Sequence, residues 1–174
     1  MSVLLPWGDH TPEIRAGAFV APNTSIIGDV VVGEESSIWF GSTLRGDVMP
    51  IRVGPRTSIQ DNSVIHATEG WVPTLVGCDC VVGHGVILHG CSLGDRVLVG
   101  MGSIILDGVE IGDDVLIGAG SLVTPRTKIP TGSLVMGTPA KVRRPLTDEE
   151  RASIVSGAAH YVDKARRYRA LVAD

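Results

Sequence analysis

The sequence predicts a mainly β fold: a parallel β-helix of hexapeptide repeats, about seven triangular coils tall, followed by one C-terminal α-helix. Three observations predict it. A branched aliphatic residue recurs at every sixth position over most of the chain, glycine often follows it directly, and only 4% of the residues are aromatic. The periods of helices and simple strands, 3.6 and 2 residues, do not select one aliphatic in every six over so long a stretch.

The six-residue beat comprises twenty hexads with two interruptions. Three hexads close one coil of about eighteen residues, and the beat residue points inward and stacks on its equivalent in the next coil. With about 4.8 Å between stacked strands, the prism should be about 32 Å tall. The predicted inward residues are Ile14, Val20, Ile26, Val32, Ile38, Leu44, Val53, Ile59, Ile65, Leu75, Val81, Ile87, Leu93, Val99, Ile105, Ile111, Ile117, Val123, Ile129 and Val135.

A long helix is predicted to follow the prism. The run from Thr147 to Glu150 is typical of a capping box, in which the threonine oxygen accepts from an early amide and the glutamate reaches back. We therefore expect a hexapeptide-repeat β-helix over 1–140, and a linker and helix over 141–174 that pack on a flank of the prism, in a single domain overall. Apolar residues recur at helical spacing at Ile154, Val155, Ala158, Val162, Ala165 and Leu171.

Composition excludes several function classes. The net charge is −4, with 7 basic and 14 acidic side chains in 1–140 and 8 basic and 5 acidic ones in 141–174. A nucleic-acid-binding protein would need a basic face on the body, which is acidic. There is no apolar run as long as a membrane span and no signal-like start, so we expect no nucleic-acid or membrane partner and a cytoplasmic location. Cys78, Cys80 and Cys91 are expected to be reduced structural thiols that leave room for redox sensitivity.

The histidines beside the beat predict a metal site. Counting hexads places His66 and His89, here called the histidine pair, on the same face one coil apart. The same count places His84 on the neighbouring face. Tetrahedral zinc in catalytic sites typically takes three protein ligands and a water. One prism can aim only the pair at a common ion, so a second prism would have to supply His84, and threefold symmetry would close the ring.

The same counting sorts the other polar residues into two complementary half-sites. Arg45 and Asp47 belong to the face of the histidine pair, whereas Gln60 and Asp61 belong to the face of His84. His10 and His160 have no matching partners, and we expect them at the surface.

These residues stand in an ordered set of motifs: Arg45-Gly46-Asp47, Gln60-Asp61, His66, Gly83-His84, His89-Gly90-Cys91, Gly100-Met101-Gly102 and Gly137-Thr138-Pro139-Ala140. Over nearly the whole chain, the set resembles the gamma-class carbonic anhydrase family. The resemblance implies left-handed coils and a homotrimer with a divalent metal, usually Zn²⁺ and in some members Fe²⁺ or Co²⁺. It also implies that His66 and His89 come from one chain and His84 from its neighbour. The implied reaction is reversible hydration of carbon dioxide to bicarbonate, with a metal-bound hydroxide as the nucleophile.

The resemblance also implies roles for residues around the metal. Gln60 would orient the hydroxide or the substrate by hydrogen bonding. Arg45 would pair with Asp61 or Asp47 across or near the subunit boundary, since its planar fork suits a bidentate carboxylate contact. The alternative is that Gln60 makes only a structural hydrogen bond and that the arginine pair only stabilises the trimer.

Two further residues are candidates for catalysis. Glu69, in the short insert after His66, could carry protons between the site and solvent, and Tyr161 of the helix resembles a family tyrosine that approaches the site. This chain has Val48 where some active members carry a glutamate, and its insert is much shorter than their acidic loop. Exposure for Glu69 and packing for Tyr161 are the simpler alternatives.

Two other functions stay open at this point. One is a metal-binding homologue with little hydration activity or with another small substrate. The other is a hexapeptide acyltransferase that uses acyl-coenzyme A and a histidine as general base, because fold alone does not choose between chemistries.

Overall fold

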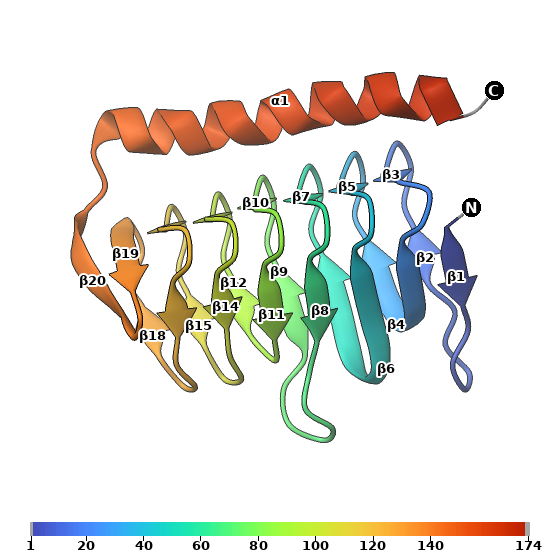
Figure 1. The fold of residues 1–174 in the computed structure, drawn as a ribbon, viewed down its shortest axis with the longest axis horizontal. Helices are drawn as coiled ribbons and strands as arrows, with labels where there is room; N and C mark the ends of the chain where they lie inside the picture. The colour runs from blue at the N-terminus through green and yellow to red at the C-terminus, as the bar shows by residue number, and fades with distance from the viewer. Residues whose placement is uncertain (1, 173–174) are drawn as a thin grey trace.

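The computed structural model describes residues 2–172 and confirms the predicted fold class. A triangular parallel β-solenoid of about seven turns carries the helix α1 (Asp148–Val172) along its length (Figure 1). Each turn contributes one short strand to each of three faces, because a new corner follows every hexad.

The helix face, the one that α1 covers, consists of β3, β5, β7, β10, β13, β16 and β19 in parallel order. The last strand, β20, pairs antiparallel with β19 and falls within the segment expected to be a linker. The bounds are β3 (Phe19–Val20), β5 (Ser37–Ile38), β7 (Ser58–Ile59), β10 (Val81–Val82), β13 (Leu98–Val99), β16 (Leu116–Ile117), β19 (Ser133–Gly137) and β20 (Ala140–Pro145).

The other two faces share the long strands β4 (Ser25–Val32) and β6 (Thr43–Val53), which run around a corner and pair on both sides of it. The face that bears the histidine pair, here the histidine face, continues with β1 (Val3–Leu5), β8 (Val64–His66), β11 (Ile87–His89), β14 (Ile104–Ile105) and β17 (Leu122–Val123). The third face continues with β2 (Glu13–Ile14), β9 (Thr74–Val76), β12 (Ser92–Leu93), β15 (Glu110–Ile111) and β18 (Lys128–Ile129).

The predicted beat forms the core, except in one coil where it is wrong by one residue. Leu75 and Ile87 are 39% and 36% exposed, whereas Val76 and Leu88 are 4% and 0% exposed and pair with inward residues of the neighbouring coils. Each hexad of this coil contains two adjacent aliphatics, either of which could point inward. The strand pairing shows that the second of the two does so. As a result His66 and His89 both directly follow an inward residue, and His84 follows Val82 by two.

A second inward layer lies at the corners. Small polar residues there donate to carbonyls of the next coil, as Thr57 Oγ1 does to Gly77 O at 2.7 Å. Cys80 and Cys91 occupy the same layer, where burial raises the pKa of each thiol to about 12. The three cysteines are free in the structure.

The helix begins as predicted. Glu150 N donates to Thr147 Oγ1 at 3.2 Å, and Thr147 N donates to the Glu150 carboxylate at 2.9 Å, so the capping box is confirmed. Four of the predicted apolar positions are buried against the solenoid, but Val155 and Leu171 are 49% and 72% exposed and lie off the packed stripe.

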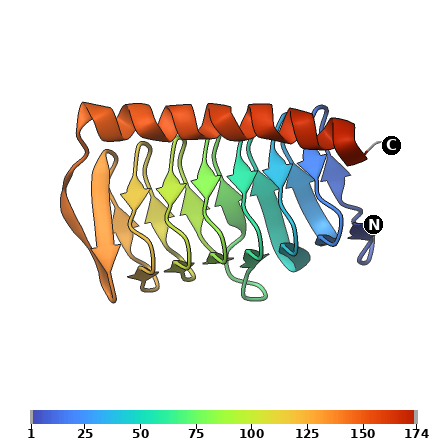
Figure 2. The ribbon, with the colours of Figure 1, turned by 45° about the horizontal axis from the view of Figure 1, so that its top comes forward.

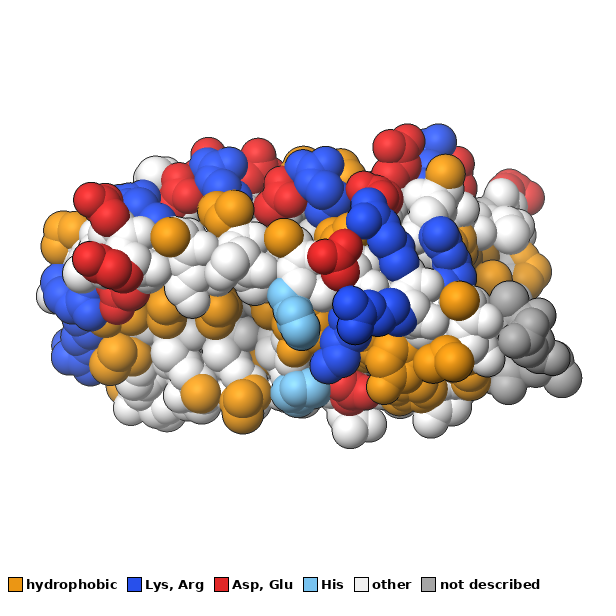
Figure 3. All heavy atoms as spheres, turned by 90° about the horizontal axis from the view of Figure 1, so that it is seen from above, with side chains coloured by type: hydrophobic (Ala, Val, Ile, Leu, Met, Phe, Trp, Pro, Cys, Tyr) orange, Lys and Arg blue, Asp and Glu red, His pale blue; other side chains and the backbone are white. Residues whose placement is uncertain are grey.

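The helix runs along the length of the solenoid (Figure 2), and acidic and basic side chains are interspersed on the side of the molecule that Figure 3 shows. Among residues 2–172 no helix combines the length and the apolar character required to cross a bilayer.

Candidate metal centre

The histidine pair lies at the ends of two stacked strands. His66 of β8 and His89 of β11 are direct partners in the parallel ladder, and Arg45 of β6 occupies the next position in the same column. His66 Nδ1 lies 3.2 Å from His89 Nε2, with the two rings edge to face.

A carboxylate holds the other nitrogen of each ring. Asp47 Oδ1 lies 3.0 Å from His66 Nε2, and Asp107 Oδ2 lies 2.8 Å from His89 Nδ1. Burial opposes ionisation of both aspartates, but hydrogen bonds from Arg45 and His66 to Asp47, and from His89 and the Thr68 amide to Asp107, outweigh it and lower each pKa. Ionised carboxylates only accept, so each imidazole must donate its N–H to its aspartate.

This hydrogen bonding leaves two lone pairs facing each other. With the outer nitrogens protonated, His66 Nδ1 and His89 Nε2 are both acceptors, and a cation between them would relieve their repulsion. Two ligands at ~2.0–2.1 Å from a tetrahedral ion are about 3.3–3.4 Å apart, close to the 3.2 Å observed. Burial also lowers the pKa of His66, which favours the neutral ring that binds metal. The pair therefore fits a divalent metal ion.

His84 lies elsewhere. It follows β10 of the helix face, at the tight corner Gly83-His84-Gly85, and its Nδ1 lies 2.9 Å from Asp61 Oδ2. Its side chain is half exposed. Over residues 2–172, no group of three or more His, Cys, Asp or Glu side chains that could hold a metal is present. One chain thus presents two histidines on one face and a third histidine, with its own carboxylate, at another corner.

The other predicted residues distribute around these two half-sites. Gln60 is buried, and its backbone N–H donates to Val82 O at 2.9 Å, next to the corner of His84. Arg45 pairs with Asp47 at 2.5 Å. Glu69 lies exposed in the loop 67–73, which follows the strand of His66.

Tyr161 packs with its ring 5.9 Å from the Trp39 ring, which makes it part of the aromatic cluster beneath the helix. Burial, and then the charge of Asp61, raise the pKa of its hydroxyl. Tyr161 therefore lies on the side of the half-site of His84, rather than beside the histidine pair.

Sequence reasoning missed Asp107 and assigned two other aspartates incompletely. Asp47 and Asp61 were expected only as partners of Arg45, yet each contacts a histidine. Asp107 stands eighteen residues after His89, one coil further, and the periodicity that located the histidines would have found it.

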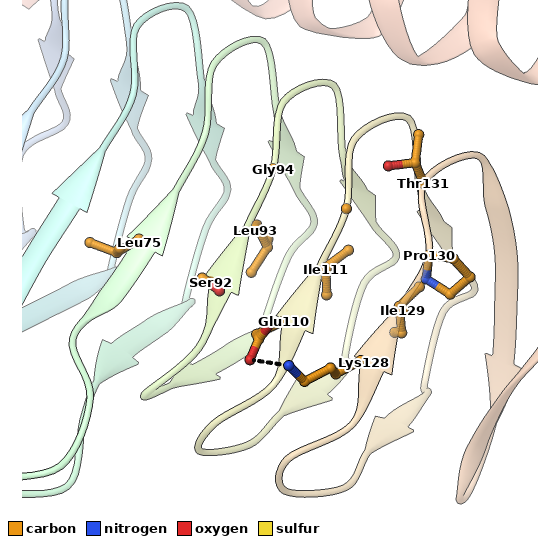
Figure 4. A pocket seen from close by; sticks show the side chains of 11 residues that line it. Leu75, Ser92, Leu93, Gly94, Glu110, Ile111, Lys128, Ile129, Pro130 and Thr131 are labelled. Atoms are coloured by element: carbon orange, nitrogen blue, oxygen red, sulfur yellow. Dashed lines mark ion pairs between the residues drawn. The ribbon is translucent and has the colours of Figure 1, made fainter.

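A shallow hollow on the third face, where Glu110 and Lys128 form an ion pair at 3.0 Å, contains none of the predicted site residues (Figure 4). Its lining has no group of titratable side chains comparable with the histidine pair and its carboxylates.

Comparison with known proteins agrees with these motifs. The chain is 47% identical over 169 residues to a carbonic anhydrase of Geobacillus kaustophilus, covering 97% of this chain and 92% of that protein. It is 43% identical over 167 residues to the mitochondrial gamma carbonic anhydrase 1 of Arabidopsis thaliana, covering 93% of this chain but 61% of that protein. The chain belongs to the gamma-class carbonic anhydrase family. It spans about three fifths of the length of its Arabidopsis relatives.

Two further matches concern the fold of this gamma-class chain. Residues 90–125 match the family of bacterial transferase hexapeptide repeats. A crystal structure from Bacillus cereus, described as a candidate acetyltransferase, superposes with a TM-score of 0.96 at 46% identity and covers 98% of both chains. The two matches confirm the repeat architecture, which carbonic anhydrases and acyltransferases share.

Proposed function

We propose that the protein catalyses the reversible hydration of carbon dioxide to bicarbonate as a homotrimer. A divalent metal ion, Zn²⁺ or alternatively Fe²⁺ or Co²⁺, is held at each subunit boundary by His66 and His89 of one chain and His84 of its neighbour. The observation that carries the proposal is the close approach of two imidazole nitrogens, His66 Nδ1 and His89 Nε2, which lie 3.2 Å apart. The cytoplasmic location stays a prediction.

The metal supplies one chemical function, which is to acidify a water so that hydroxide is available near neutral pH. The protein's own residues do the rest. Asp47 and Asp107 keep the outer nitrogens of the pair protonated, so that the inner nitrogens stay free to bind metal. Asp61 can do the same for His84 through the contact at 2.9 Å.

Orientation of the reactants falls to Gln60 and Arg45. Gln60, buried beside the corner of His84, offers an amide to align the hydroxide or carbon dioxide when that corner meets the neighbour. Arg45, next to His66 in the column, is anchored by Asp47, and this contact keeps its guanidinium beside the site.

Protons must also leave the site. Glu69 stands exposed on a loop that begins directly after the strand of His66, so it can exchange protons with solvent. Tyr161 lies near Asp61 and acts, in this proposal, by packing the helix against the half-site of His84.

A second candidate is acyl transfer from acyl-coenzyme A, and the observation that favours it is the Bacillus cereus structure described as a candidate acetyltransferase. Acyl transfer would need one histidine as general base and no metal. A metal-binding trimer without appreciable hydration activity is the third candidate. Metal dependence and hydration rate separate the three.

The test combines metal analysis with stopped-flow hydration of carbon dioxide, each with and without imidazole buffer. We expect about one metal ion per chain, and a hydration rate that falls to background in His84→Ala. His10→Ala is the matched control and should behave as wild type, because its exposed imidazole pairs with Asp29 at 3.9 Å and is none of the three proposed ligands. Fully loaded protein with no hydration in either buffer would contradict the proposal, as would normal metal content in His84→Ala.

A further inference from the structure

We propose that Asp107 is a positioning residue of the metal centre that joins the orientation of His89 to that of the loop 67–73. This inference rests on the proposed function, since it concerns how the ligand is held for the metal. Asp107 does not belong to any of the motifs that relate the chain to its family, and it comes from the coil beyond the histidine pair, directly after Leu106.

The two oxygens of this carboxylate have different partners. Oδ2 accepts from His89 Nδ1 at 2.8 Å, and Oδ1 accepts from the backbone amide of Thr68 at 3.3 Å. The side chain is only 14% exposed. Because Nδ1–H donates to an ionised acceptor, His89 is held in the tautomer whose Nε2 lone pair faces His66.

Glycines make room for this arrangement. A Cβ added at Gly90 would collide with Asp107 Oδ1, and Gly90 already has a φ of 54°, where only glycine is unstrained. This accounts for the glycine in the motif His89-Gly90-Cys91. The backbone beside the ligand is left open so that the carboxylate of the next coil can reach both the ring and the loop.

The loop is fixed at a second point by the coil beyond that of Asp107. The Arg126 guanidinium lies 5.1 Å from the Trp71 ring centroid, and Trp71 N donates to Thr68 O at 3.3 Å. A Cβ at Gly108, next to Asp107, would lie 3.5 Å from Trp71 Cζ2. The loop is therefore held on both sides of Glu69, at Thr68 and at Trp71. Because Asp107 contacts both Thr68 and His89, it fixes the position of Glu69 relative to His89.

Replacement of Asp107 by asparagine keeps the shape but removes the charge. The neutral amide can either accept from or donate to Nδ1, so the tautomer of His89 is no longer fixed. We expect Asp107→Asn to bind Zn²⁺ about 10–100-fold more weakly in chelator competition. In the Co²⁺-loaded variant we expect an altered visible absorption, a readout of ligand geometry that does not depend on turnover.

Asp113→Asn is the matched control, because its carboxylate also accepts a backbone amide of another coil, that of Asp95 at 2.9 Å, but touches no histidine. Asp107→Ala adds a test of the loop, because the amide hydrogens of residues 67–73 should exchange with solvent faster in this variant than in wild type. Asp107→Asn and Asp107→Ala should both remain trimers by light scattering.

Three outcomes overturn the inference. If Asp107→Asn keeps the wild-type Zn²⁺ affinity and Co²⁺ spectrum, Asp107 does not position the ligand, while the proposed function stands. If Asp113→Asn weakens metal binding equally, the effect is a general one on the solenoid. If wild-type protein takes up no metal, both this inference and the proposed function fail.

Discussion

Mixing two defective variants should rebuild metal sites that neither variant has alone. His84→Ala removes one half-site and leaves His66 and His89 intact, whereas His66→Ala does the reverse. Each homotrimer should therefore lack complete sites, because the structure places His84 and the pair at different corners of the solenoid. In randomly mixed trimers at equal amounts, a site needs an intact pair and an intact His84 from the next subunit. Each has a chance of one half, so about one quarter of the sites recover.

The assay is refolding of the two variants together, followed by metal analysis and carbon dioxide hydration, with both expected at about 25% of wild type. Mixing His66→Ala with His89→Ala is the control, because both changes damage the same half-site and no arrangement of subunits restores it. Equal recovery in the two mixtures, or none in the first mixture when trimers have formed, would refute the shared site.

Two further predictions test the core. Leu88→Ala should lower the free energy of unfolding by about 2–5 kcal/mol because the side chain is fully buried, whereas Leu75→Ala, 39% exposed, should cost less than about 1 kcal/mol in denaturant titration. A larger loss at Leu75 would mean that the original six-residue beat, not the strand pairing, describes the core. Native protein at pH 8 should take up about one iodoacetamide label, at half-buried Cys78. Burial, and then the charge of Asp95, raise the pKa of this thiol, so the label should enter slowly, whereas Cys80 and Cys91 are fully buried and burial raises their pKa to about 12. Labelling of all three thiols before unfolding would contradict this.

Periodicity was enough to predict the architecture because nearly every hexad contains a branched aliphatic at the position that points inward. The predicted inward residue was wrong in one coil, whose hexads contain two adjacent aliphatics. In Leu75-Val76 and Ile87-Leu88 either neighbour can enter the core, and the choice depends on pairing with a coil about twenty residues away. Local sequence does not contain this pairing.

In the candidate site, too, the sequence predicted some features and not others: it predicted the positions of the histidines but not the partners of the aspartates. Hexad counting brought His66 and His89 together and separated His84, and the register agrees with that count. Counting could not assign partners to the aspartates, because which carboxylate meets which ring depends on how far a side chain reaches around a corner. Asp47 therefore appeared as a partner of Arg45, although it holds both Arg45 and His66.

Coil length explains why the site lies where it does. On the histidine face, successive inward residues stand 21 residues apart from Leu44 to Ile65 and 23 apart from Ile65 to Leu88, but 17 apart from Leu88 to Ile105. The extra residues lie beside the histidine pair, in the corner segment of β6 that includes Asp47 and in the loop 67–73. The short step follows His89, where the turn at Gly90 leaves the ring open to Asp107 from the next coil. The interruption between Leu44 and Val53 thus supplies the carboxylate on one side of the histidine pair, Asp47, and the regular coil after His89 supplies the carboxylate on the other side, Asp107.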